Sequence, residues 1–119
     1  MDEHKIIELL TVNGMSKNVS ILLMELKNVN GQGLTQTDLI SRTGLNQPAI
    51  SIATAQAYRD GYLKPTICKK DRNVGRGSPF FYRYTLARPF PEIINTFINE
   101  RSQELSKMMM DLQRLQEVA

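Results

Sequence analysis

The sequence predicts a mainly α-helical fold with a small β-hairpin and a long C-terminal helix. Apolar residues recur at helical spacing through most of residues 1–60. Residues 62–86 instead hold two strand-like segments around a polar, glycine-rich stretch. An apolar repeat of about 3.5 residues then runs almost to the C-terminus. Because 119 residues suit one domain, we expect that domain over residues 1–88 and a C-terminal helix over residues 89–119.

Composition excludes several classes of protein. Apolar residues make up 41% and charged residues 23% of the chain, which is ordinary for a globular protein. The longest apolar run, Ile21–Met24, is too short to cross a membrane, and the acidic N-terminus does not resemble a secretory signal. One cysteine and one histidine offer little to a disulfide, a metal site or a nucleophilic mechanism. We therefore expect a cytoplasmic protein that is not an enzyme and binds no metal or cofactor.

Four features that could carry chemistry have plainer interpretations. Met108–Met110 offers soft metal ligands, but packing is favoured because no cysteine or histidine is near in sequence. Cys68 could sense redox state, although a small buried side chain is its commoner role. His4 is expected at the surface. Gly75–Gly77 fails the dinucleotide-binding pattern because no helix follows it.

Two amphipathic helices are predicted before residue 30. Residues 2–11 place apolar side chains at roughly helical spacing, and the helix ends before Asn13-Gly14. Ser16 can cap a second helix that reaches about Asn28. The buried face of this second helix is expected to consist of Val19, Leu22, Leu23 and Leu26.

A shorter helix is predicted after the turn at residues 30–33. Thr35 and Asp38 have the spacing of a capping box, in which each residue's side chain bonds the other's backbone. The helix that they begin should bury Leu39 and Ile40. It ends at Gly44, a residue that readily adopts the left-handed conformation of a helix C-terminus.

A further helix is predicted from Asn46, its N-cap, to about Asp60. Pro48 falls in its first turn, where a missing N–H group costs nothing. Two short helices joined by a glycine-centred turn form a helix-turn-helix motif. The inward-facing residues of this helix are expected to be Ile50, Ala53 or Thr54, and Ala57.

Two strands are predicted next, over Tyr62–Lys70 and Phe80–Leu86, joined by the polar loop Asp71–Pro79. The second strand alternates between two faces, with Phe80, Tyr82 and Tyr84 on one and Phe81, Arg83 and Thr85 on the other. A helix-turn-helix motif followed by a basic hairpin is the winged-helix arrangement. We therefore expect a winged helix-turn-helix fold with a long C-terminal dimerisation helix.

Positive charge is concentrated in the hairpin. Residues 61–88 carry seven basic side chains and one acidic side chain, whereas residues 1–60 and 89–119 each carry a small excess of acidic groups. A concentrated positive segment suits a polyanion better than a neutral partner, although a solvated charged loop is the simpler alternative. Because counterions are released when cations neutralise phosphates, a basic loop gains affinity for nucleic acid without exact geometry. The expected phosphate or minor-groove contacts are Lys69, Lys70, Arg72 and Arg76.

The helix from Gln47 to about Asp60 is the predicted recognition helix. Gln47 can pair with adenine, Ser51 can bond a base edge or a phosphate, and Ile52 or Ala55 can touch a thymine methyl group. No lysine or arginine occurs between Pro48 and Tyr58, so strong guanine recognition is not expected. A near-neutral helix face also suits contact with another protein. The alternative function is therefore a winged-helix protein-interaction module within a larger assembly.

The C-terminal helix, predicted over residues 91–118, carries one apolar stripe interrupted by Arg101. At about 1.5 Å per residue this helix is roughly 42 Å long, which exceeds what the domain needs for its own core. The helix could still lie along its own domain. We expect instead that it forms a symmetric homodimer, since an exposed apolar seam needs a partner. The expected interface residues are Ile94, Ile98, Leu105, Met108, Leu112 and Leu115, with help from the N-terminal helix.

Several segments resemble a known family. Gly44–Ser51 reads Gly-Leu-Asn-Gln-Pro-Ala-Ile-Ser, and Gly61–Leu63 reads Gly-Tyr-Leu. With residues 14–18 and 34–39, they resemble small archaeal winged-helix transcriptional regulators, related to the MarR and TrmB-like groups. The resemblance covers residues 14–118. The chain departs from the family pattern at Thr54 and Ala57, where larger aliphatic residues are common.

This resemblance implies a function. It implies that the helix opened by Gln47 and Pro48 enters double-stranded DNA, that the loop over residues 72–76 is the wing, and that the terminal helices dimerise. The expected protein is thus a homodimeric, sequence-specific regulator of transcription. Half-sites about 10 base pairs apart would place its two recognition helices in successive major grooves.

Overall fold

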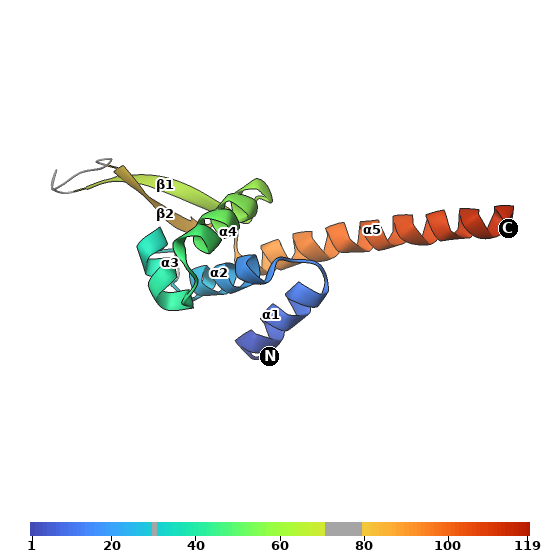
Figure 1. Ribbon diagram of the computed structural model, residues 1–119, viewed down its shortest axis with the longest axis horizontal. Coiled ribbons are helices and arrows are strands. Elements are labelled where there is room, and N and C mark those ends of the chain that lie inside the picture. Colours follow the sequence, from blue (N-terminus) through green and yellow to red (C-terminus); the bar gives the residue numbers. More distant parts are fainter. Residues whose placement is uncertain (30, 71–79) are drawn as a thin grey trace. The chain divides into compact units, whose positions relative to one another are not determined.

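A computed structural model describes residues 1–29, 31–70 and 80–119 of the chain. It divides into two compact units, Met1–Arg88 and Pro89–Ala119. Within the described residues the first unit holds four helices and a two-stranded antiparallel sheet, and the second holds one helix (Figure 1). The elements in chain order are α1 (Glu3–Val12), α2 (Lys17–Asn28), α3 (Gln36–Thr43), α4 (Gln47–Arg59), β1 (Leu63–Lys69), β2 (Phe80–Leu86) and α5 (Phe90–Val118). The prediction of a mainly helical fold with a hairpin and a long C-terminal helix is confirmed.

Helix α2 is the centre of the first unit, because it contacts α1, α3, α4 and β2. Ser16 accepts a hydrogen bond from the Val19 backbone and begins the helix. The predicted buried face is confirmed, since its four residues are at most 2% exposed. The largest fully buried side chains of the unit come from α2, α3, α4 and the start of β1: Leu22, Leu23, Met24, Leu39, Ile50 and Leu63.

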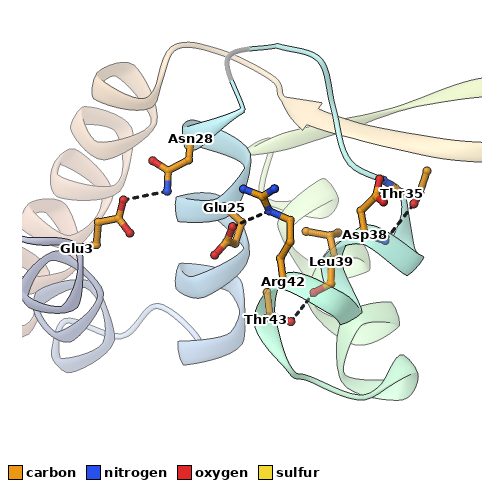
Figure 2. Close-up of polar contacts among 8 residues, drawn as sticks. All are labelled: Glu3, Glu25, Asn28, Thr35, Asp38, Leu39, Arg42 and Thr43. Atoms are coloured by element: carbon orange, nitrogen blue, oxygen red, sulfur yellow. Dashed lines mark hydrogen bonds and ion pairs between the residues drawn. The ribbon is translucent and has the colours of Figure 1, made fainter.

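Polar contacts at the surface tie α2 to its neighbours (Figure 2). The Nε of Arg42 on α3 lies 2.9 Å from the Oε2 of Glu25. On the other side, the side-chain amide of Asn28 donates to the Oε1 of Glu3 on α1 at 2.9 Å. An exposed ion pair such as Arg42–Glu25 stabilises a fold little, so burial of apolar side chains holds these helices together.

Helix α3 begins at the predicted capping box (Figure 2). The Asp38 N–H donates to Thr35 Oγ1 at 3.1 Å, and the Thr35 N–H donates to Asp38 Oδ2 at 3.0 Å. That backbone bond lowers the pKa of Asp38 below its ordinary value, as do Arg83 and Arg42, while burial opposes the shift. The ionised Asp38 carboxylate therefore stabilises the folded protein fully above the ordinary pKa of an aspartate. This stabilisation is lost as the pH falls through the lowered pKa of Asp38.

Helix α4 follows α3 after the left-handed Gly44. Asn46 Oδ1 accepts from the Ala49 N–H at 2.9 Å and begins the helix where the sequence predicts. The predicted inward face is confirmed, with Ile50, Ala53, Thr54 and Ala57 all buried. The buried Thr54 hydroxyl is not left without a partner, because it donates to the carbonyl groups of Ile50 and Ser51. On α3, Leu39 is buried as predicted, but Ile40 is only half-buried.

The hairpin pairs β1 with β2 in antiparallel register, from Leu63 opposite Leu86 to Lys69 opposite Phe80. Leu34, just before α3, adds a short bridge on the free edge of β2 through two backbone hydrogen bonds with Tyr84. The predicted strand bounds are confirmed to within one residue. The predicted loop over residues 71–79 lies outside the described residues.

Helix α5 is the whole of the second unit apart from its terminal residues, and it has 29 residues. It begins one residue before the predicted start and ends where predicted. Its buried residues are Ile93 and Phe97, and Ile94 beside them is half-buried. Among the described residues, no helix is both long and apolar enough to cross a membrane.

Candidate functional site

The outward face of α4 holds every predicted recognition residue. These side chains are exposed while their neighbours on the helix fill the core, because residues three or four apart share one side of a helix. Ile52 is 68% exposed, although it is a large apolar residue. The residues on this face are Gln47, Pro48, Ser51, Ile52 and Ala55.

A cleft of about 430 Å³ lies between this helix and the hairpin. Ser51 and Ala55 line it from α4, and Tyr82 lines it from β2. Among the residues that the structure describes, none that lines this cleft is charged. The described residues that line it are Gln36, Ser51, Thr54, Ala55, Tyr58, Pro65, Tyr82 and Tyr84. A second cleft of about 290 Å³ adjoins it along Gln36, Tyr82 and Tyr84.

The register of the hairpin places one of its faces toward this cleft. Pro65 pairs with Tyr84, and both line the cleft. The next pair on the same face is Ile67 with Tyr82, and the one after that is Lys69 with Phe80, because side chains alternate along a strand. This face therefore runs outward from the buried core, past the cleft, toward the far end of the hairpin.

The hairpin carries cations on both of its faces: Lys69 lies on the face that lines the cleft, and Lys64 lies on the opposite face. Within the described residues, no ion pair engages Lys64, Lys69 or Lys70, whose side chains are exposed. Arg83 lies on the opposite face of β2, and its guanidinium carbon is 5.8 Å from the centre of the Phe81 ring. The hairpin thus presents positive charge beside an uncharged, partly aromatic cleft.

The predicted phosphate contacts divide into two pairs. Lys69 ends β1, Lys70 follows it, and both are exposed. Arg72 and Arg76 lie outside the described residues. Ser51 and Ala55 are brought together with the hairpin at the cleft, whereas Gln47 and Ile52 do not line it.

Sequence reasoning missed the aromatic component of this surface. Tyr58 follows the predicted recognition residues by one turn of α4 and is 59% exposed. Tyr82 lies on the aromatic face of the second strand, a face that the sequence does predict. That alternation is a usable signal for an exposed aromatic face, but nothing in the sequence predicts that Tyr58 and Tyr82 line one cleft.

The stripe on α5 is a second candidate surface. Ile94 is half-buried, and the remaining five predicted interface residues are exposed. Their exposed fractions are 51% for Ile98, 60% for Leu105, 59% for Met108, 59% for Leu112 and 63% for Leu115. Met109 and Met110 are as exposed as Met108, so packing within this chain does not explain them. Cys68 is half-buried in β1, and His4 is exposed as predicted.

Comparison of the sequence with models of protein families and with curated proteins found no match.

Proposed function

We propose that this protein is a winged helix-turn-helix transcriptional regulator that binds double-stranded DNA as a homodimer. One observation carries the proposal: the exposed face of α4 and the cationic hairpin belong to the same unit and border the same cleft. The order of α3, α4, β1 and β2, with Leu34 bridging β2, is the order that a winged helix requires.

Helix α4 is the proposed recognition helix. Gln47 and Ser51 lie one turn apart near its N-terminus, the end of a recognition helix that contacts base edges. Gln47 can bond the adenine edge with two hydrogen bonds, and Ser51 can bond a base or a phosphate. Ile52 and Ala55 offer apolar contact to thymine methyl groups. This set favours A·T-containing sites, because no arginine or lysine lies between Pro48 and Tyr58 to pair with guanine.

The hairpin is the proposed backbone contact. Lys69 and Lys70 are exposed near the end of β1, and the sequence adds Arg72 and Arg76 in the following loop. Contacts to phosphates fix the register of a protein on a duplex but carry no sequence information. The hairpin therefore supplies affinity, and α4 supplies discrimination.

Dimerisation through α5 completes the proposal. The exposed apolar stripe on this helix keeps a heptad spacing, which suits a parallel or antiparallel pairing of two copies. Two copies present two recognition helices, and a roughly palindromic site with half-sites about one helical turn apart would accept both.

The experiment that tests DNA binding replaces Lys69 and Lys70, the two predicted phosphate contacts that lie within the described residues. Lys69→Ala with Lys70→Ala should weaken binding to every duplex by a similar factor, because both side chains are assigned to phosphates. The slope of log Kobs against log salt concentration should become shallower by up to about two. The measurement is fluorescence anisotropy with a labelled duplex at several salt concentrations.

A matched control removes the same charge elsewhere. Lys5→Ala with Lys17→Ala also deletes two lysines, but from α1 and α2, and neither residue lines the cleft. This control should keep most of the salt slope. An equal loss of slope in both double variants would show that only net charge matters and would refute the assignment of the hairpin.

The second candidate function is a protein-interaction module. The exposed fractions of Ile52 and Ile67, 68% and 64%, favour it, because the buried centre of a protein–protein interface is poor in charged residues and more apolar than its rim. Absence of duplex binding at low salt would favour this candidate over the first.

A further inference from the structure

One face of β2 carries aromatic side chains at three successive positions. Phe80, Tyr82 and Tyr84 occupy successive positions on this face, and their exposed fractions are 53%, 49% and 8%. The face is therefore part of the core at one end and exposed at the other. Because the buried end fixes the strand against the core, the exposed rings are held in position to stack on a flat ring of a ligand. We call this row of side chains the aromatic platform.

Two further side chains extend this platform. Ile67 pairs with Tyr82 across the hairpin and is 64% exposed. Tyr58 approaches from α4, and both Tyr58 and Tyr82 line the cleft of about 430 Å³. The ring of Tyr82 is already 6.4 Å from the ring of Tyr84, at an interplanar angle of 35°. The cleft thus has aromatic side chains from two different elements.

The DNA contacts assigned above do not use these rings. In an intact duplex each base is stacked on its neighbours, so the faces of the bases are not open to a tyrosine. Aromatic side chains stack on bases that have left the duplex stack, and this stacking tolerates any base because each has a π-face. Exposed tyrosines in a cleft beside a cationic hairpin therefore match an unstacked base better than a paired one.

We propose that the cleft between α4 and the hairpin binds a nucleobase that has left the stack of a nucleic-acid strand, with Tyr82 and Tyr58 as its stacking side chains. The proposal rests on the proposed function and adds the state of the base that this surface accepts. The uncharged lining matches a neutral base. Gln36 and Ser51 in that lining offer donors and acceptors to the edge of the base.

The charge of Lys69 indicates whether the base belongs to a nucleic-acid strand or to a free nucleoside. Lys69 lies on the same face of the hairpin as Tyr82, two positions along β1 from Ile67. A base within a strand brings flanking phosphates to such a cation, whereas a free nucleoside brings none. The occupant is therefore a base carried by a strand, as at a bulge, a flipped nucleotide or a single-stranded segment.

The test compares three probes with the full chain: a blunt duplex of about two helical turns, the same duplex with one unpaired thymidine, and free thymidine monophosphate. The bulged duplex should bind about tenfold more tightly than the blunt one, within the range measured for one stacked base. The free nucleotide should bind far more weakly than either. Because the chain has four tyrosines and no tryptophan, its emission comes from tyrosine, and the bulged probe should quench this emission more than the blunt probe does.

Variants at Tyr82 separate the ring from its hydroxyl group. Tyr82→Ala should abolish most of the preference for the bulged duplex and leave affinity for the blunt duplex nearly unchanged. Tyr82→Phe, the matched control, should keep the preference, because the ring remains. If Tyr82→Ala fails to fold, the wild-type comparison of blunt and bulged probes still decides the matter.

The outcomes distinguish this inference from the function on which it rests. Equal affinity of the wild-type protein for blunt and bulged duplexes overturns the inference and leaves the proposed function intact. A failure to bind either duplex overturns both. Binding of free thymidine monophosphate as tight as that of the bulged duplex overturns the assignment of a strand as the source.

Discussion

Gly33 shows how one residue positions the hairpin against the helices. It precedes Leu34, whose N–H and carbonyl both bond the backbone of Tyr84, at 3.0 and 2.8 Å. Its φ of +79° lies in the left-handed region, and a Cβ atom there would come within 3.1 Å of Thr85 Cγ2 and 3.2 Å of the Tyr84 carbonyl oxygen. A side chain at this position would therefore push the segment before α3 away from β2.

Gly44 provides the matched comparison for a substitution at Gly33. Its φ of +74° is similar, but nothing lies within 4 Å of an added Cβ atom. Gly44→Ala should cost about 1–2 kcal/mol of unfolding free energy from its backbone conformation alone. Gly33→Ala should cost more, because it adds close contacts to the same backbone strain. Urea unfolding of both variants measures the difference, and a larger loss for Gly44→Ala would contradict the account.

The roles of residues that bond only to nearby residues in the chain could be predicted from the sequence. Ser16, Thr35 and Asn46 cap their helices at the predicted positions, because a capping side chain bonds a backbone group only three residues away. The sequence left open whether Ala53 or Thr54 faces inward, and the structure buries both. The role of Gly33 could not be predicted, since the atoms that exclude a side chain come from β2, about 50 residues later.

At the scale of one element, α5 shows both the strength and the limit of reading a periodic pattern. Its bounds and its apolar stripe follow from the spacing of leucine, isoleucine and methionine. The buried residues Ile93 and Phe97 lie beside the predicted stripe, at positions that the heptad pattern does not include. The first turns of α5 carry apolar residues on two adjacent faces, and periodicity alone does not say which of the two faces is buried.

The proposed role of α5 in dimerisation is tested by two neighbouring methionines. Met108 lies on the stripe and Met110 lies on the opposite side of the helix, and their exposed fractions are 59% and 57%. Met108→Glu should weaken the dimer by tenfold or more, about 1.4 kcal/mol, because it places a charge in each half of the seam. Met110→Glu adds the same charge away from the seam and should leave the dimer intact.

Light scattering at several concentrations measures the mass of each variant against the 13.6 kDa of a single chain. Because both methionines are exposed in the single chain, neither substitution disturbs its core. Wild-type protein that remains monomeric at micromolar concentration would refute dimerisation through this stripe. Equal effects of the two substitutions would refute its assignment to one side of the helix.

On the scale of the whole molecule, the candidate site depends on segments far apart in sequence. Local pattern predicts the exposed face of α4 and the charge of the hairpin separately. The cleft needs Gln36 from α3, Ser51 and Tyr58 from α4, and Tyr82 from β2 together. Their meeting depends on how α4 and the hairpin pack, which no spacing along the chain encodes. The alternation of Phe80, Tyr82 and Tyr84 could be predicted from the sequence, but the meeting of Tyr58 and Tyr82 in one cleft could not.

The central claim is that α4 and the hairpin form one nucleic-acid-binding surface. The most direct measurement is a titration of the isotope-labelled 13.6 kDa chain with a short duplex, followed by amide chemical shifts in NMR spectra. We expect the largest shifts at Gln47, Ser51 and Ala55 of α4 and at Ile67 and Lys69 of β1. Shifts confined to α1 and α5, or no shifts at low salt, would contradict the claim.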